Sequence, residues 1–168
     1  MNLSTFVRDI PDFPKKGIVF KDISPLLNNV EALRNCIETL VANSPKKIDK
    51  VIGIEARGFF FGVPLAEKLD AGFIPVRKKG KLPYKTVSES YSLEYGKDVL
   101  EIHEDAIQKG DKVLIHDDVL ATGGTAKAVI NLVERLGGEV VQCNFLIELD
   151  FLNGKENLDT PIYSLLNY

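Results

Sequence analysis

The segment VLIHDDVLATGGT, residues 113–125, combines residue types that can bind a phosphorylated sugar. Asp117 and Asp118 end a largely apolar run typical of a buried strand, and a glycine-rich turn follows before a helix-like stretch. Glycines let backbone N–H groups approach a ligand closely, and the N–H groups that begin a helix bind phosphate. Carboxylates accept hydrogen bonds from hydroxyl groups or bind a metal ion. A sugar phosphate carries both kinds of group.

Three other interpretations of this segment remain open on its own residues. It is similar to the Walker B strand of nucleotide-binding proteins, but that site also needs a GxxxxGK[ST] string, which the chain lacks. The two acids could instead be a phospho-acceptor pair, although the glycine-rich turn then has no explanation. In the third interpretation, Thr122 caps a helix, the glycines form an ordinary turn, and the acids lie at a solvated strand end.

Helix and strand patterns alternate through the middle of the chain, which predicts an open, mainly parallel α/β sheet flanked by helices. In such sheets ligands bind at the carboxyl ends of the strands, near a switch in strand order. A short helix is expected at 4–10, and the C-terminal segment 153–168 is assigned no chemistry. The expected longer helices are 30–43, 58–69 and 122–137, and the expected strands are 50–54, 72–78, 99–107 (near an edge), 112–117 and 139–149.

The composition restricts the class of protein. With 168 residues, of which 45% are hydrophobic, the chain can bury one domain's core. A net charge of −3 argues against a nucleic-acid-binding protein, and the apolar runs are too short to span a membrane. No signal peptide is recognised at the N-terminus. We interpret Cys36 and Cys143, which lie far apart, as reduced core thiols, and therefore expect a cytoplasmic protein.

The segment 113–125 closely resembles the phosphoribosyl-pyrophosphate (PRPP) motif of type I phosphoribosyltransferases, which has two acids, two variable residues and ATGGT. Four more stretches resemble the adenine-specific members of this family in order and spacing: FPKKGIVFKDISPLL, GIEARGFFFGVPLA, VRKKGKLPYKT and YSLEYGKDVLEIHEDAI. The resemblance extends from about residue 13 to 152. His116 departs from it, because the family usually has an aliphatic residue there. We interpret His116 as a local packing or hydrogen-bonding substitution.

The resemblance implies a purine salvage enzyme that transfers the 5-phosphoribosyl group from PRPP to adenine, giving AMP and pyrophosphate. It implies a single domain over 1–168, with an N-terminal hood at about 1–30 and a flexible catalytic loop at about 77–97. Mg²⁺ would be carried by PRPP, with no dedicated protein metal site, and the protein would be a homodimer. The alternatives are transfer to xanthine, guanine or orotate, or a non-catalytic PRPP-binding regulator.

Roles for individual residues also follow from the resemblance. Asp117 and Asp118 would hold the ribose hydroxyls. Asp118→Asn should therefore weaken ribose positioning and reduce turnover. The fold should survive, because the acids are expected at a solvent-facing strand end. The 5′-phosphate would be anchored by Ala121, Thr122, Gly123, Gly124 and Thr125. Arg57 offers a planar fork to the diphosphate. The loop around it would contain a cis peptide bond near Glu55–Ala56.

The basic run RKKGKLPYK would belong to the catalytic loop, although such charge runs are more often solvated faces. Arg77 and Lys81 would meet the pyrophosphate, with Arg77 able to do so from the neighbouring subunit of a dimer. Glu94 and Tyr95 would close on the base, and Glu94 would handle the proton at adenine. The alternative for Glu94 is an exposed residue on a hairpin.

The hood would contact adenine. Phe20 would stack on the purine, while Val19 and Lys21 would contact it largely through backbone atoms. Leu149, after the last predicted strand, would cover the base from the other side. Without the resemblance, an aromatic residue in a proline-rich loop is more often part of a satellite core.

Overall fold

The chain forms two compact units, Met1–Thr39 and Leu40–Tyr168. This computed structural model describes residues 1–93 and 96–168, and the side chains outside 92–97. The prediction of one domain over 1–168, with a hood and a flexible loop, stays a prediction.

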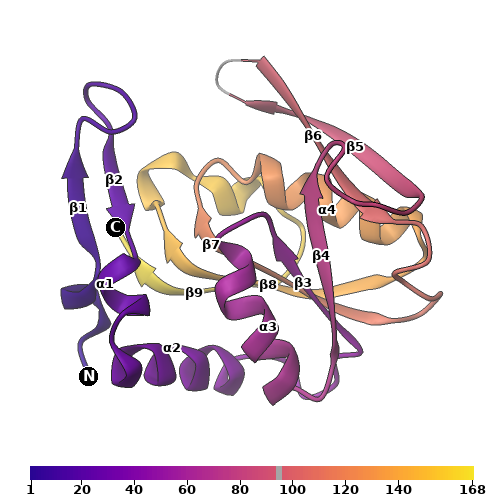
Figure 1. Ribbon diagram of the computed structural model, residues 1–168, viewed down its shortest axis with the longest axis horizontal. Coiled ribbons are helices and arrows are strands. Elements are labelled where there is room, and N and C mark those ends of the chain that lie inside the picture. Colours follow the sequence, from indigo (N-terminus) through magenta and orange to yellow (C-terminus); the bar gives the residue numbers. More distant parts are fainter. Residues whose placement is uncertain (94–95) are drawn as a thin grey trace. The chain divides into compact units, whose positions relative to one another are not determined.

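The first unit contains an antiparallel hairpin (Figure 1), in which β1 (Arg8–Pro11) pairs with β2 (Val19–Asp22). A single 3₁₀ turn, η1 (Leu3–Phe6), precedes the hairpin, so the helix expected at 4–10 was wrong in its second half. Residues 8–10, which were expected to be helical, pair with β2 as part of β1. After α1 (Ser24–Leu27) comes α2 (Val30–Ala42), which confirms the helix predicted at 30–43. The backbone N–H groups of Glu31 and Ala32 donate to Asn29 Oδ1 and cap this helix.

The second unit contains a seven-stranded sheet with the order β5-β6-β4-β3-β7-β8-β9. Strands β4, β3, β7, β8 and β9 are parallel, whereas β6 pairs antiparallel with both β4 and β5. This arrangement confirms the predicted mainly parallel α/β sheet. The strand bounds are β3 Lys50–Ile54, β4 Gly72–Lys78, β5 Thr86–Leu93, β6 Gly96–His103, β7 Lys112–Leu120, β8 Glu139–Glu148 and β9 Ile162–Asn167.

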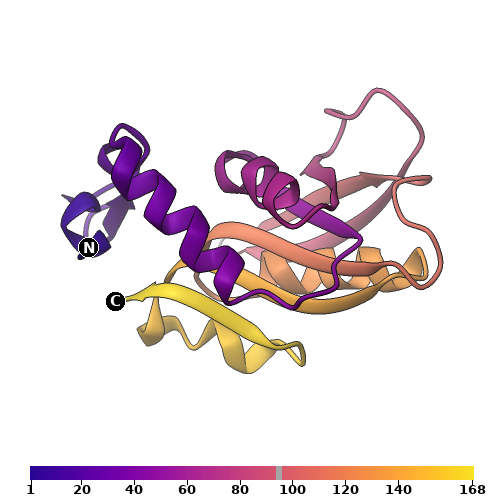
Figure 2. The same ribbon diagram turned by 90° about the horizontal axis from the view of Figure 1, so that it is seen from below.

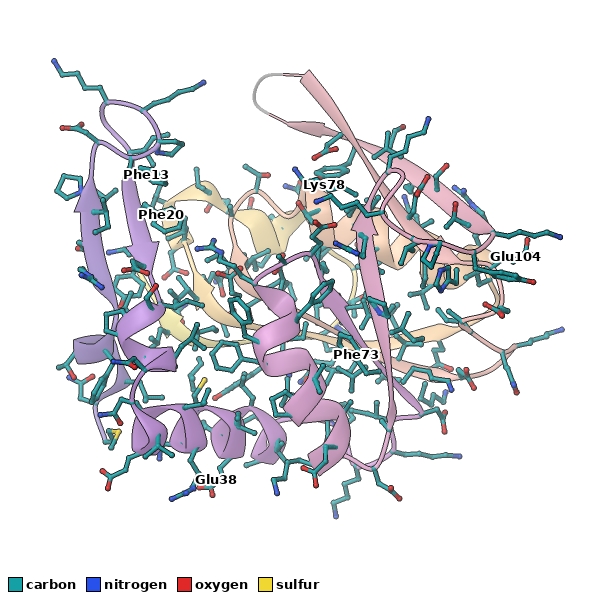
Figure 3. The ribbon with its side chains drawn as sticks, viewed as in Figure 1. Phe13, Phe20, Glu38, Phe73, Lys78 and Glu104 are labelled. Atoms are coloured by element: carbon teal, nitrogen blue, oxygen red, sulfur yellow. The ribbon has the colours of Figure 1, made fainter. Side chains whose placement is uncertain are left out.

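Helices α3 (Gly58–Lys68) and α4 (Gly124–Arg135) cover opposite faces of this sheet (Figure 2). Helix α4 buries an apolar stripe that includes Val129, Leu132 and Val133, in the main core cluster. On the other face, the ring of Phe73 lies against Gly62 of α3 and Gly53 of β3 (Figure 3). The two glycines give that ring its space, because an added Cβ would lie 2.8 Å from it at either position.

Two strands were not expected from the sequence. Residues 86–93 form β5, which pairs along its length with β6, and its Val87 and Tyr91 pack against the core. Beyond the short turns η2 (Asp150–Leu152) and η3 (Gly154–Asn157), the C-terminal β9 extends the sheet beside β8. Among the described helices, none has the length and apolar character that a membrane crossing requires.

Candidate active site

A cavity of about 310 Å³ lies where β3 and β7 end, at the edge of the sheet predicted to bind ligands. Its wall comes from the loop after β3, from β7 and the turn that follows it, and from the arm formed by β4, β5 and β6. The lining residues are Ile54, Glu55, Ala56, Arg57, Lys78, Tyr91, Leu100, Asp117, Asp118, Val119, Ala121 and Thr125.

The loop between β3 and α3 brings Arg57 to the acid pair. The Glu55–Ala56 peptide bond is cis, as predicted. The Arg57 Nε lies 2.8 Å from Asp118 Oδ2, so the two form an ion pair. Helix α3 begins directly against β7, where a Cβ on Gly58 would lie 2.9 Å from the carbonyl oxygen of His116. Only glycine permits this close approach without a shift, so it helps to set where Arg57 meets the acids.

The acid pair is less solvated than predicted. Strand β7 continues to Leu120, and the whole Asp118 residue is only 4% exposed, so the expected solvent-facing position was wrong. Asp117 Oδ1 accepts a hydrogen bond from the Asp118 N–H at 2.9 Å. Burial, and then the charge of Asp118, raise the pKa of Asp117 well above its ordinary value. Burial also raises the pKa of Asp118, and Arg57 opposes that rise.

The glycine-rich turn forms a second, smaller cavity of about 50 Å³ beside the first. The two cavities share Asp117, Val119, Ala121 and Thr125. The smaller one is also lined by Leu120, Thr122, Gly123, Ala126 and Phe145. Gly123 has φ +82° and precedes the first turn of α4, whose leading N–H groups have no intrahelical acceptor. Gly124 lines neither cavity in the described part of the chain.

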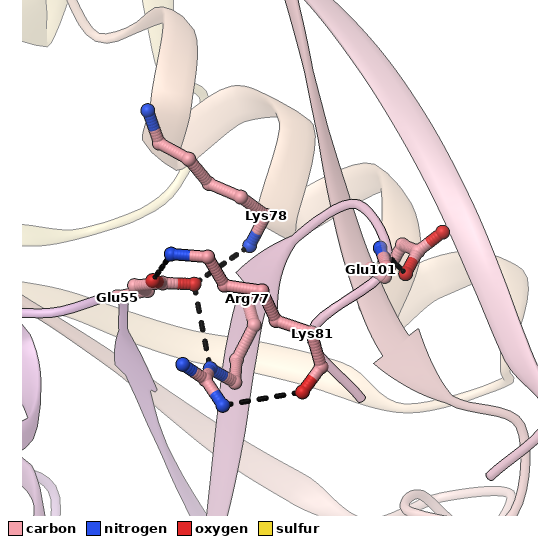
Figure 4. A network of polar contacts seen from close by, with 6 residues as sticks. Glu55, Arg77, Lys78, Lys81 and Glu101 are labelled. Atoms are coloured by element: carbon pink, nitrogen blue, oxygen red, sulfur yellow. Dashed lines mark hydrogen bonds and ion pairs between the residues drawn. The ribbon is translucent and has the colours of Figure 1, made fainter. Parts of the chain in front are cut away.

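Three residues of the basic run, Arg77, Lys78 and Lys81, contact the carboxylate of Glu55 (Figure 4). The backbone N–H of Lys78 donates to Glu55 Oε2 at 2.9 Å, and Arg77 Nε lies 3.4 Å from the same oxygen. Lys81 Nζ contacts Glu55 Oε1, and Arg77 Nη1 donates to the Lys81 carbonyl at 3.1 Å. Arg77 and Lys81 are therefore held beside the main cavity, although neither is among its lining residues.

Sequence reasoning did not select Lys78, Tyr91 or Glu55 as site residues. Lys78 lines the cavity and pairs with Asp98 at 3.0 Å, and the Tyr91 hydroxyl lies 3.5 Å from the same carboxylate. Burial, the largest influence on Tyr91, raises the pKa of its hydroxyl. The signals were present in the basic run and in YSLEYG, where alternation along a strand puts Tyr91 on one face.

The roles predicted for the remaining site residues stay predictions. Glu94 and Tyr95 lie outside the described residues. Leu149 precedes η2 in the second unit and does not line either cavity. Val19, Phe20 and Lys21 form most of β2 in the first unit, where the rings of Phe13 and Phe20 meet edge-on at 5.2 Å (Figure 3). Their predicted contacts with adenine stay predictions.

His116 has the packing role that was predicted for it. Its ring is fully buried, its Nδ1 lies 2.7 Å from Asn144 Oδ1, and Phe61 contacts it edge-on. Burial lowers the pKa of His116 to about 4, against an opposing effect from Asn144. The histidine is therefore neutral at physiological pH and is buried, while the next residue, Asp117, lines the cavity.

Comparisons with known proteins agree with this geometry. A family model described as "Phosphoribosyl transferase domain" matches residues 21–167. The chain belongs to the adenine phosphoribosyltransferases. It is 64% identical to the adenine phosphoribosyltransferase of Flavobacterium johnsoniae, over 100% of both chains. The crystal structure of the Rhodothermus marinus enzyme superposes with a TM-score of 0.94 at 58% identity, over 99% of this chain and 96% of that one.

A more distant adenine phosphoribosyltransferase has the same fold. The enzyme from Saccharomyces cerevisiae was solved with an imino-altritol bisphosphate and adenine. It superposes with a TM-score of 0.89 at 42% identity, over 98% of this chain and 96% of that one. Membership of this family of pentosyl transferases replaces the Walker B and phospho-acceptor interpretations of segment 113–125.

Proposed function

We propose that the two adjoining cavities bind PRPP and that the chain transfers its 5-phosphoribosyl group to adenine, forming AMP and pyrophosphate in purine salvage. The observation that carries this proposal is the meeting of Arg57, Asp117, Asp118 and the glycine-rich turn at one end of the sheet. Each group suits one part of PRPP. The Arg57 cation suits the diphosphate, the two carboxylates suit the ribose hydroxyls, and the N–H groups at the start of the helix suit the 5′-phosphate.

The acids and the turn position the ribose. Asp117 and Asp118 accept hydrogen bonds from its hydroxyls, which fixes the anomeric carbon for in-line attack by adenine N9. The 5′-phosphate lies in the smaller cavity, on the N–H groups and hydroxyls of 121–125. This phosphate is remote from the bond that breaks, so its binding energy goes into placing the reacting carbon.

Cations stabilise the leaving group. As the bond between the anomeric carbon and the diphosphate breaks, negative charge accumulates on the departing pyrophosphate. Arg57 lies in the cavity wall, and Arg77 and Lys81 stand beside it on the basic run. Fixed positive charges close to the developing anion lower the barrier. Lys78, which sequence reasoning did not select, is a fourth cation at this position.

Mg²⁺ fits this site as a companion of the substrate. The described residues contain no group of three or more histidine, cysteine or carboxylate side chains placed to hold an ion. Asp117 and Asp118 are two adjacent oxygen donors, so most of the remaining ligands would be diphosphate oxygens and water. When bound, Mg²⁺ neutralises part of the diphosphate charge.

Adenine would contact residues of the hood and Leu149 of the second unit. Phe20 stacks on the base, Val19 and Lys21 contact it through backbone atoms, and Leu149 covers its other side. Glu94 handles the proton of adenine, and Tyr95 helps the loop to close over the site. The proposal for these residues rests on the match to adenine phosphoribosyltransferases over the whole chain and on the resemblance of the YSLEYG string to that family.

The working protein would be a cytoplasmic homodimer that binds neither nucleic acid nor membrane. Phe60 and Val63, which are 49% and 52% exposed on α3, supply apolar surface for a second copy. Light scattering should give about twice the mass of one chain. In that assembly Arg77 would act either in its own subunit, where it already contacts Glu55, or in the neighbouring one.

The test is a matrix of bases. Purified protein with Mg²⁺ and PRPP is mixed with adenine, hypoxanthine, guanine, xanthine or orotate, and both nucleotide and pyrophosphate are measured. AMP formed with adenine alone is the expected result. Product from another base would retain the PRPP site and overturn the roles given to the hood. PRPP binding without any product would favour the non-catalytic regulator.

A further inference from the structure

The carboxylate of Glu55 closes a ring of charges around the base of the catalytic loop. One oxygen faces Lys81 Nζ, the other faces Arg77 Nε, and Arg77 in turn donates to the carbonyl of Lys81 (Figure 4). The Glu55 side chain is only 8% exposed, whereas Arg77 and Lys81 are 35% and 48% exposed. The carboxylate is thus the buried member, and the cations are its more accessible partners.

Glu55 is an unexpected residue for a diphosphate site. It lines the same cavity as Arg57, so its negative charge faces the space assigned to an anion. A carboxylate there repels diphosphate unless cations neutralise it. The cations that neutralise it are Arg77 and Lys81, which are needed for the leaving group. The same two side chains therefore have two competing anionic partners.

We propose that Glu55 is a positioning residue that holds Arg77 and Lys81 in the ligand-free protein and exchanges them for the diphosphate when substrate binds. The identity of the incoming anion rests on the proposed function. A diphosphate carries more charge and more acceptor oxygens than one carboxylate, so it wins the exchange. Glu55 retains the backbone N–H of Lys78 as a hydrogen-bond donor after the side-chain cations leave.

The exchange has consequences in both directions. On binding, the diphosphate must displace Glu55 from the two cations, which costs part of its binding energy. On release, Glu55 recaptures them as pyrophosphate departs, which keeps the product from binding too tightly. Removal of the charge of Glu55 should therefore strengthen pyrophosphate binding and slow its release.

The experiment measures the affinity of the full-length protein for inorganic pyrophosphate with Mg²⁺ by calorimetry. Glu55→Gln keeps the shape and the hydrogen bond from the Lys78 N–H but removes the charge. Its dissociation constant should fall about threefold to fivefold, the size expected for one partly exposed ion pair. In a Lys81→Met background the same substitution should give a clearly smaller gain, because one competing cation is absent.

Glu101→Gln is the matched control. This carboxylate is also buried, at 7% exposure, and lies at the base of the same loop. It accepts a hydrogen bond from the N–H of Gly80 at 2.9 Å, and no ion pair to it occurs among the described residues. Removing its charge should leave pyrophosphate affinity within twofold of the wild type. If Glu55→Gln fails to fold, Glu55→Ala gives the same readout, because it also removes the charge that competes for Arg77 and Lys81.

The outcomes separate this inference from the proposed function. Weaker or unchanged pyrophosphate affinity in the folded Glu55 variant would overturn the exchange, even if the wild type forms AMP. A gain as large in the Lys81→Met background, or in Glu101→Gln, would also overturn it. A Lys81-dependent gain supports the exchange whether or not adenine proves to be the base. Slower pyrophosphate release in stopped-flow traces of Glu55→Gln would support it further.

Discussion

At the scale of single residues, the acid pair depends on one cation. Asp118 is buried against Arg57, and burial raises the pKa of both neighbouring carboxyls. Because Arg57 lies at the cavity rim, a ligand that contacts it also changes the charge balance of the acids. Such coupled, buried acids in a cavity are typical of functional sites.

Asp118→Asn should lower kcat/KM for PRPP at least tenfold, since the neutral amide holds the ribose hydroxyls less well and leaves Arg57 without its partner. The free energy of unfolding should change by less than about 1 kcal/mol, because the lost ion pair with Arg57 is offset by removal of a charge that burial disfavours. Steady-state kinetics and thermal unfolding measure the two effects. Asp159→Asn, which alters an acid whose side chain is 96% exposed, is the control and should change neither.

The burial of His116 predicts that the free energy of unfolding depends on pH. Its pKa in the folded chain is about 4, against an ordinary 6.5. The unfolded chain therefore takes up the proton first as pH falls, so the stabilising contribution is complete above pH 6.5 and is lost as pH falls towards 4. The full loss is on the order of 3 kcal/mol. Urea unfolding between pH 4 and 7 measures it.

His116→Gln is the comparison variant, because its amide can hydrogen-bond to Asn144 but does not titrate in this range. The difference in unfolding free energy between wild type and variant should narrow, or reverse, as pH falls. A difference that stays constant from pH 7 to 4 would contradict the buried, neutral histidine. Asp117 and Asp118 titrate in both proteins, so their contributions largely cancel.

Residues whose role is written in a local string could be predicted from the sequence. Asp117, Asp118 and Arg57 stand in such strings, and the structure brings them together. Tyr91 could not be placed in the cavity in this way, because its position depends on the antiparallel pairing of β6 with β4 and β5. Glu55 stands in the same string as Arg57, but its contacts with Arg77 and Lys81 cannot be read from that string. Burial of Asp118 was missed because β7 continues beyond the acids, beside β8.

At the scale of elements, the C-terminal segment supports the glycine-rich turn at 121–125. The Asn157 side chain donates to the carbonyl of Thr122 at 2.9 Å, and Gly154 lies against Gly123 and the Ala121 carbonyl with no room for a Cβ. No local motif predicted η3 or β9, because these elements form through contacts with other parts of the chain. The turn at 121–125 is thus fixed by α4 on one side and by η3 on the other.

Asn157→Ala should raise the KM for PRPP about threefold to tenfold, since one hydrogen bond to the turn is lost, while the KM for adenine stays unchanged. Asp159→Asn again serves as control, because Asp159 lies in the same segment and contacts Lys127 at the surface. Equal increases in both Michaelis constants would argue for a general loss of structure. Asn157→Gln is not expected to restore the KM for PRPP, because the longer side chain cannot keep the same hydrogen bond to the Thr122 carbonyl.

At the scale of the whole molecule, strand order creates the site. Arg57 and Asp118 are far apart in sequence but adjacent in space, because β3 and β7 are parallel neighbours at the centre of the sheet. Alternating strand and helix patterns predicted this class of sheet, and the rule for ligands at carboxyl ends predicted the edge. The order of the strands and the antiparallel arm of β5 and β6 could not be predicted, since neither is specified by any local pattern.

Ligand binding should therefore be measurable as stability of the whole protein. A ligand that binds only the folded chain adds about 2.7 kcal/mol when present at one hundred times its dissociation constant. For a chain of this length that corresponds to a rise in Tm of roughly 5–10 °C. AMP should produce such a rise, and adenosine at the same concentration should produce much less, because it lacks the phosphate that we propose binds in the smaller cavity. An equal rise with adenosine would mean that 121–125 does not anchor the phosphate. In Asn157→Ala the advantage of AMP over adenosine should shrink, since the turn that recognises the phosphate has lost one of its supports.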